Sequence, residues 1–375
     1  MFYYFLIIYL IFGVFFRTVL NWEYIDEISV VCLLIIAIFR TKIMNNIEFV
    51  VLSIYILFCL IYSFAFSLNR NSYAICFDAF QQFKPFLMFY AVYMLWHKPL
   101  TAFQNHCLAK LSFLLAIISF LIVLISGDIR AFYGHPANYS SSILCFAVIH
   151  YFFTRGKNPK ATFLIMLFGI IGGRSKMFGE VVLVGYILLV LKKKIKFNLK
   201  YILVSCFLLV GIIFVAREKI SFYLYGNDVA EADQIARTLF YTNMPYLLLR
   251  YFPFGSGLAS YATWFSGVYY SPLYAELGMS NVYGITQDFY DFIADTYFPS
   301  LAEFGVLGIS LFLLFWIKRY KVIRQINYHY KTKIIILGVL IIESTTSTFI
   351  VSAAGLIPML ILAINEKESL IRQVS

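Results

Sequence analysis

Long apolar segments separated by short polar connections dominate the sequence. A helix needs about 20 apolar residues to cross about 30 Å of hydrocarbon, which predicts about 12 membrane helices here. We therefore predict an all-α fold, a polytopic integral membrane helical bundle that forms one membrane domain over residues 1–375. The predicted helices lie near residues 2–16, 25–39, 47–68, 73–96, 108–126, 137–154, 161–173, 177–191, 200–216, 297–317, 334–348 and 351–364. Several ranges are short, which leaves the count open by about one or two helices.

The composition excludes an ordinary water-soluble fold. Hydrophobic residues make up 62% of the chain and charged residues 13%, whereas soluble domains carry about 25% charged residues. Residues 1–16 lack basic residues and a small-residue cleavage site, so we expect a retained membrane helix and no cleaved signal. The 6 cysteines lie in or beside apolar segments without C-x-x-C spacing. We expect them to form neither a disulfide framework nor a metal site.

The basic residues indicate how the chain crosses the membrane. A formal net charge of +11 could suggest nucleic acid, but these residues gather in short connections, as the positive-inside rule requires. We therefore expect membrane lipids around the chain and no nucleic-acid partner. Placing the basic connections inside puts both termini in the cytoplasm and residues 217–298 outside, as one long loop with short interfacial helices.

Arginine predominates among the basic residues outside these inner connections, whereas lysine predominates within them. A lysine point charge is enough to orient a chain. The guanidinium group presents a planar fork of donors and keeps its charge, which suits phosphate recognition. The outer arginines therefore need an explanation other than orientation.

A polar segment between two apolar ones, GGRSK at residues 172–176, carries the first candidates. Ionisable groups at membrane depth cost about 2.5–3.5 kcal/mol each, so they usually face a cavity and mark function. The alternative is that Arg174 and Lys176 extend to the lipid headgroups or pair with Glu180. The two glycines favour a functional site, because they let a ligand approach the backbone closely.

Two arginines in the long loop, Arg237 and Arg250, flank an apolar segment that precedes PFGSG at residues 253–257. This segment is too short to span a membrane and is followed by Pro and Gly, which indicates an interfacial or re-entrant helix. For Arg237 we favour function, because an anion at the helix start would also meet free backbone N–H groups. For Arg250 a solvated helix cap is an equally good explanation.

Other polar and aromatic groups are candidates on the same side. The turn of residues 128–138 contributes Arg130 and His135, although a lone histidine is more often a structural group. The loop is rich in tyrosine, including Tyr261 and Tyr274. These rings suit glycan stacking, and an aromatic belt at a membrane interface is equally expected.

Acidic residues near the end of the loop are candidate general bases. Asp288, Asp291 and Asp295 share one face if this segment is helical, and we expect the first two to be solvated. Asp295 and Glu303 lie closer to the membrane and are better placed to accept a proton from a hydroxyl. No Walker loop, H-E-x-x-H, G-x-S-x-G or D-x-D motif occurs, so we expect no metal and no cofactor.

Four segments, taken in order, resemble the bacterial O-antigen polymerase and ligase superfamily. The resemblance covers residues 128–308, whereas the earlier part of the chain matches only as hydrophobic segments. It implies an enzyme of the bacterial inner membrane with its active site in the periplasm. The segments are RAFYGHPAN (130–138), GGRSK (172–176), Arg237 ahead of PFGSG (253–257), and EFGVLG (303–308).

The resemblance also implies a metal-independent glycosyl transfer. A glycan on undecaprenyl diphosphate would move to a hydroxyl of a second lipid-linked glycan, which polymerises repeat units into O-antigen of lipopolysaccharide or a related surface polysaccharide. The family's essential arginines correspond to Arg174 and Arg237, which would hold the diphosphate and stabilise its charge as it leaves. We expect the lipid-linked donor and acceptor, a chain-length regulator and a flippase as partners. The other candidate residues are Asp295 and Glu303 for catalysis and Lys176, Arg130, His135, Arg250, Tyr261 and Tyr274 for substrate binding.

Three alternatives stay open. The ligases, which transfer finished glycan to lipid A core or protein, carry a histidine just before E-x-G-x-x-G, where this chain has residues 295–297 as Asp-Thr-Tyr. We therefore favour the polymerase. A flippase or other transporter is expected to show two repeated halves around a midplane site, whereas the charged groups here gather on one face. If the chain is an assembly scaffold, loss of Arg174 should not impair its function.

Overall fold

Every regular element that the computed structural model describes is a helix. The described residues are 2–20, 24–41, 46–191, 232–321 and 328–374. The long helices are α1 (Phe2–Ile8) continued by η1 (Tyr9–Phe15), α3 (Ile25–Arg40), α4 (Ile47–Phe66), α5 (Ser72–Leu95), α6 (Ala102–Ser126), α8 (Pro136–Phe153), α9 (Pro159–Phe168) with η3 (Gly169–Gly172), α10 (Ser175–Gly185) with η4 (Tyr186–Val190), α12 (Ala232–Arg250), η5 (Phe298–Phe304) with α15 (Gly305–Lys321), α16 (Tyr328–Thr346) and α17 (Ala353–Val374). The short ones are α2 (Arg17–Leu20), α7 (Ile129–Tyr133), α13 (Trp264–Val268), α14 (Leu273–Glu276) and η6 (Phe349–Val351).

The predicted all-helical fold is confirmed for these residues, and the predicted helices coincide with observed ones. The exception is the helix at 200–216, which lies outside the described residues. Three helices are long and apolar enough to cross a membrane, and they cover Ile47–Phe66, Ala102–Ser126 and Phe298–Tyr320. These three indicate a membrane protein, and the larger number of spans stays a prediction.

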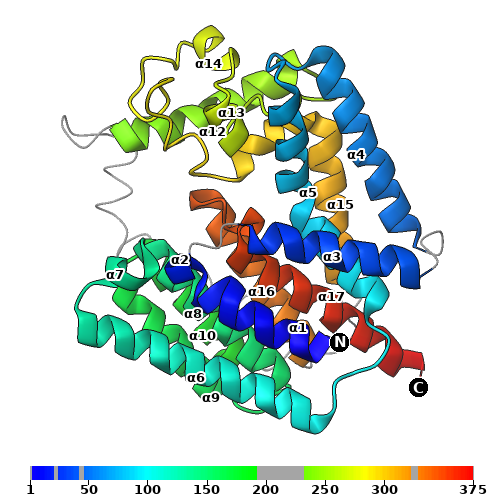
Figure 1. Ribbon diagram of the computed structural model, residues 1–375, viewed down its shortest axis with the longest axis vertical. Coiled ribbons are helices and arrows are strands. Elements are labelled where there is room, and N and C mark those ends of the chain that lie inside the picture. The colour runs from blue at the N-terminus through cyan, green and yellow to red at the C-terminus, as the bar shows by residue number, and fades with distance from the viewer. Residues whose placement is uncertain (1, 21–23, 42–45, 192–231, 322–327, 375) are drawn as a thin grey trace, which may run out of the picture.

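The helices form a bundle with a buried centre (Figure 1). In this view α1, α16 and α17 cross the middle, α6 to α10 lie on one side, and α4, α5 and α12 to α15 lie on the other. Helix α8 is buried at every residue from Tyr139 to Phe153, because α6, α9, α16 and α17 pack around it. By contrast, α4 exposes Ile54, Leu57 and Ile61 by more than half, as a helix that faces lipid does.

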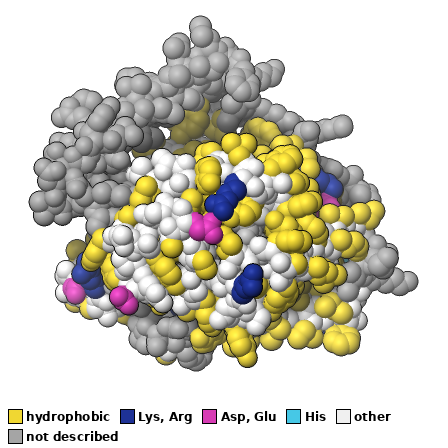
Figure 2. Space-filling view, turned by 90° about the horizontal axis from the view of Figure 1, so that it is seen from above, with side chains coloured by type: hydrophobic (Ala, Val, Ile, Leu, Met, Phe, Trp, Pro, Cys, Tyr) yellow, Lys and Arg dark blue, Asp and Glu magenta, His cyan; other side chains and the backbone are white. Residues whose placement is uncertain are grey.

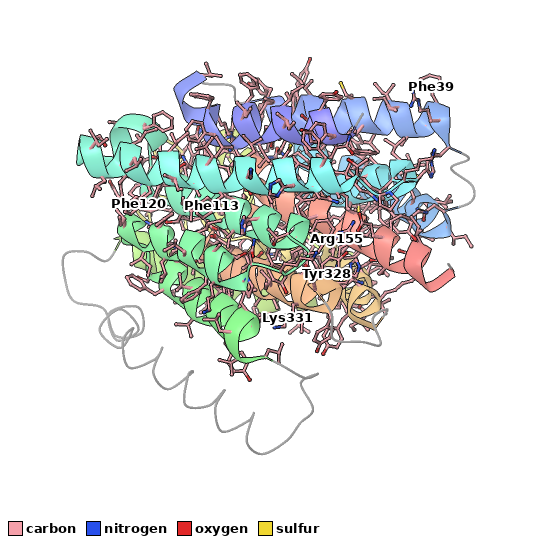
Figure 3. All side chains as sticks on the ribbon, turned by 90° about the horizontal axis from the view of Figure 1, so that it is seen from below. Phe39, Phe113, Phe120, Arg155, Tyr328 and Lys331 are labelled. Carbon is pink, nitrogen blue, oxygen red and sulfur yellow. The ribbon has the colours of Figure 1, made fainter. Side chains whose placement is uncertain are left out.

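Helices α4, α5 and α15 carry polar contacts at two opposite ends. At one end Arg319 of α15 bonds to Glu48, near the start of α4, and to Glu366 of α17. At the other end, which we call the loop end, Ser63 and Asn69 bond to the backbone of the long loop. In the view from below, Arg155 lies near Tyr328, the first residue of α16, and Lys331 lies further along the same helix (Figure 3).

Two glycine-containing segments, PFGSG in the loop and EFGVLG at the junction of η5 and α15, lie against each other. The Gly257 N–H donates to the Glu303 carbonyl at 3.1 Å, and the Leu307 N–H donates to the Pro253 carbonyl at 3.1 Å. A Cβ on Gly305 would collide with the Gly255 backbone, and one on Gly255 would collide with Gly305. Both glycines also have positive φ, +88° at Gly255 and +62° at Gly305. This contact therefore requires glycine in both segments.

The described part of the loop has a small core of its own, which includes Phe240 of α12, Tyr261 and Tyr274. Its outer surface is largely apolar and uncharged, with a few scattered charged side chains (Figure 2). Tyr246, Leu249 and Phe252 are each more than half exposed. Exposed aromatic and aliphatic side chains of this kind are typical of a segment at a membrane interface.

Candidate functional site

The first component of the candidate site is an ion pair between α12 and the end of the loop. The Arg237 Nε donates to Asp295 Oδ2 at 2.9 Å, and its Nη2 donates to the same oxygen. Asp295 is 31% exposed and Arg237 18%. The prediction that Arg237 stands at the start of its helix is wrong, because α12 is described from Ala232 and continues through Arg237 without a helix-breaking residue. An anion at Arg237 would therefore depend on the guanidinium and not on free helix N–H groups.

The second component is Arg174, which lies between η3 and α10. Gly173 ends η3 with φ +63°, and Arg174 then takes an extended conformation as the N-cap of α10. Its side chain is half-buried and forms no hydrogen bond or ion pair with any described residue. A Cβ on Gly172 would collide with the Ser140 hydroxyl of α8. The glycine thus lets the GGRSK segment pack closely against the first turns of α8.

His135 links these components electrostatically. It is the N-cap of α8, and its Nδ1 accepts the Ala137 N–H at 3.1 Å. The neutral ring therefore carries its proton on Nε2. Burial lowers the pKa of His135 first, and the charges of Arg174, Arg130 and Lys176 lower it further, while Asp295 opposes them. Four charges from three segments thus act on one imidazole, which lies at the loop end with a neutral N–H available as a donor.

The third component is a buried ion pair between α10 and α16. Lys176 bonds to Glu343, whose side chain is 0% exposed, and to the Ser347 hydroxyl at 3.1 Å. Pairing of Lys176 with Glu180 was one alternative to a functional role; in the structure Lys176 pairs with Glu343 instead. Glu180 is also buried and lies beside Glu343. Glu343 was missed, although a lone acid in the apolar range 334–348 is itself a sign of function at membrane depth.

A cavity of about 380 Å³ lies next to Lys176. Its wall is formed by η1, the first turns of α8 and the residues between α16 and α17. Ala137 and Asn138, which follow His135, are part of this wall. The cavity therefore adjoins the basic cluster of Arg174, Arg130, Lys176 and His135. Within the described ranges, no three His, Cys, Asp or Glu residues are placed to hold a metal ion.

Several predicted site residues lie apart from this cluster or are buried. Glu303 is 2% exposed, and its carboxylate accepts the N–H groups of Ser260 at 2.7 Å and Tyr261 at 2.8 Å. Tyr261 and Tyr274 are both 0% exposed. Their hydroxyls bond to the Phe240 carbonyl and the Ala262 N–H. These buried rings leave no face on which a sugar could stack.

Arg250 is the last residue of α12 and follows Arg237 by 13 positions. A rise of about 1.5 Å per residue separates the two Cα atoms by roughly 20 Å. Arg250 pairs instead with Glu276 at 2.8 Å, and both side chains are more than one-third exposed. The geometry agrees with the solvated helix cap that the sequence left as an alternative.

No family of known proteins matches this chain, and no curated protein or solved structure matches it. The functional argument therefore depends on the chain's own residues. RAFYGHPAN lies against GGRSK through Gly172, and PFGSG lies against EFGVLG through Gly255. The charges of Arg174 and of Asp295, the partner of Arg237, both act on the pKa of His135. The four segments singled out in the sequence are thus gathered at one end of the molecule.

Proposed function

We propose that this chain polymerises undecaprenyl-diphosphate-linked oligosaccharide repeat units at the periplasmic face of the bacterial inner membrane. The observation that carries the proposal is that Arg174, Lys176 and Asp295, the partner of Arg237, all act electrostatically on His135, which lies two residues before the wall of a polar cavity. The chain would cross the membrane about 12 times. Both termini would lie in the cytoplasm, with the loop end in the periplasm.

Arg174 and Arg237 would bind the diphosphate of the donor. Arg174 forms no ion pair with a described residue, so its guanidinium can bond to phosphate without giving up an internal partner. The oxygen of an acceptor hydroxyl attacks the anomeric carbon of the donor sugar. The bond between that carbon and the diphosphate oxygen breaks, and undecaprenyl diphosphate leaves with the electron pair. Fixed positive charge at the leaving group stabilises the transition state.

Asp295 is the better candidate for the base that accepts the hydroxyl proton. It is 31% exposed, whereas Glu303 is almost fully buried and engaged by backbone N–H groups. In the absence of substrate Asp295 holds Arg237 in place. A diphosphate that competes for Arg237 would release the carboxylate, so donor binding and activation of the base would be coupled.

The test incubates the purified protein with a lipid-linked repeat unit. A ladder of longer glycans should form. Arg174→Ala and Arg237→Ala should each reduce the ladder about 10²- to 10³-fold, the usual effect of removing one donor to transition-state charge. Arg→Lys should be nearly as damaging, because a point charge does not replace the fork. The matched control is Arg70→Ala, which removes an exposed arginine near the same end.

Normal ladders from both alanine variants, at normal protein level, would refute the proposal. A wild-type protein that forms product only when lipid A core is supplied would favour the ligase instead.

A further inference from the structure

The cavity beside Lys176 contains a second cation, Arg17, which follows η1. Arg17 is half-buried and forms no ion pair or hydrogen bond with the described part of the chain. Asp26 is close enough to interact with it electrostatically, but Asp26 bonds to Lys84 at 2.5 Å. The other cation of the wall, Lys176, is neutralised by Glu343. Arg17 thus leaves the cavity with positive charge.

Hydroxyl and amide groups alternate with apolar residues such as Val14 and Phe349 along the rest of the wall. Ser141 is only 8% exposed, yet its hydroxyl has no hydrogen-bond partner among the described residues. The Thr348 hydroxyl likewise has no described partner. The Asn138 side chain donates to the Tyr133 carbonyl, which leaves its own carbonyl oxygen able to accept. Buried polar groups normally have partners, so this wall suits an occupant that is rich in oxygen.

We propose that this cavity binds an anionic sugar residue of the lipid-linked glycan. Ser141, Thr348 and Asn138 would bind the ring hydroxyls, and Arg17 would bind a carboxylate or phosphate group on that sugar. The volume of about 380 Å³ is at the lower end of the range for small-molecule sites, about 300–1,000 Å³. The inference rests on the proposed function, because that function supplies a glycan as the substrate. The inference further specifies that the repeat unit contains a negatively charged sugar.

The experiment measures binding without turnover. The melting temperature of the purified full-length chain is followed with glucuronic acid, glucose 1-phosphate, glucose and inorganic phosphate. Either or both of the charged sugars should stabilise the wild type at lower concentration than glucose does, and the two arms distinguish a carboxylate from a phosphate. Stabilisation by inorganic phosphate that equals the better charged sugar would show an anion site only and would overturn the proposal.

Substitutions assign the effect to this cavity. Arg17→Gln should raise the half-saturating concentration of the charged sugar about tenfold or more, the usual loss for a hydrogen bond to a charged group. The half-saturating concentration for Arg17→Lys should lie between those of Arg17→Gln and the wild type. Ser141→Ala should weaken the binding of glucose and of the charged sugars alike. It also provides a second variant if Arg17→Gln does not fold. Arg70→Gln, which removes an exposed arginine outside the cavity wall, should leave binding unchanged.

Unchanged binding in both Arg17→Gln and Ser141→Ala would overturn the inference. Because binding is measured directly, this result would not affect the polymerase proposal, which is judged by the ladders of the Arg174 and Arg237 variants. Conversely, normal ladders in those variants together with intact sugar binding would refute the polymerase proposal and leave the cavity as an anionic-sugar site without an assigned glycan.

Discussion

At the scale of single residues, Glu303 shows how a buried acid can act as a structural anchor. Its carboxylate accepts two consecutive backbone N–H groups of the loop, from Ser260 and Tyr261. Asp78 of α5 accepts the preceding one, from Ala259, at 2.8 Å. Two acids from different helices thus satisfy three successive donors of an irregular segment, which no secondary structure would otherwise pair.

We expect Glu303→Ala to destabilise the protein by about 3 kcal/mol or more, because it leaves two buried N–H groups without their acceptor. Glu303→Gln keeps one carbonyl oxygen for both donors and should retain most of the stability and most of the ladder formation. Melting temperature and activity are measured on the same samples. A Gln variant with a normal melting temperature and no activity would show that Glu303 is the base.

At the scale of elements, the long loop is held by backbone contacts between segments that are far apart in sequence. Gly305 combines φ +62° with ψ −167° at the junction of η5 and α15, a region that only glycine occupies readily. Its neighbour across the contact is Gly255. The side chains of Tyr62 and Ser67, near the end of α4, bond to the carbonyls of Gly255 and Leu258. The element α4 therefore also positions the loop.

Gly305→Ala should destabilise the protein by about 2–4 kcal/mol, since the added methyl group meets backbone atoms in a strained conformation. Gly278→Ala is the matched control. Gly278 has φ +68° but open space around its Cβ position, so only the backbone strain of about 1–2 kcal/mol should appear. The measurement is melting temperature together with limited proteolysis of the loop. Equal effects of the two variants would disprove the close contact.

At the scale of the whole molecule, Arg319 of α15 holds four helices together at the end opposite the loop. It bonds to Glu48 and to Glu366, and its guanidinium lies 4.9 Å from the ring centroids of both Phe89 and Phe315. The Arg319 and Glu366 side chains are 5% and 3% exposed. This group joins α15 to α4, α5 and α17, and it lies far from the candidate site.

Arg319→Leu should destabilise the protein by about 3–5 kcal/mol, because it leaves the buried Glu366 without its main partner. Adding Glu366→Gln should restore part of this loss by removing the unpaired charge. Lys318→Ala is the neighbouring control, since Lys318 is 59% exposed and also pairs with Glu48; it should cost about 0–1 kcal/mol. The measurement is the melting temperature of the wild type and of the three variants. A loss of stability in Arg319→Leu no larger than that in Lys318→Ala would contradict the prediction.

The helical fold could be predicted from the sequence because its signal is local. The apolar range 47–68 predicted α4, which runs from Ile47 to Phe66, and hydropathy alone was enough. The candidate site was predicted in part. Arg174, Arg237 and His135 stood out as charged or polar groups beside apolar segments, and the structure brings them to one end. By contrast, Tyr261 was expected at the glycan and lies buried in the loop core, because burial in an irregular segment has no periodic signature.

By itself, the sequence determined that this chain is helical and apolar enough to enter a membrane, since the length and hydropathy of each segment are properties of consecutive residues. Only the tertiary structure decided that Lys176 pairs with Glu343, that Gly255 lies on Gly305, and that Arg17 faces a hydroxyl-lined cavity. These contacts join residues tens to hundreds of positions apart. Which partners meet depends on how the helices pack, and the spacing of residues along the chain does not determine that packing.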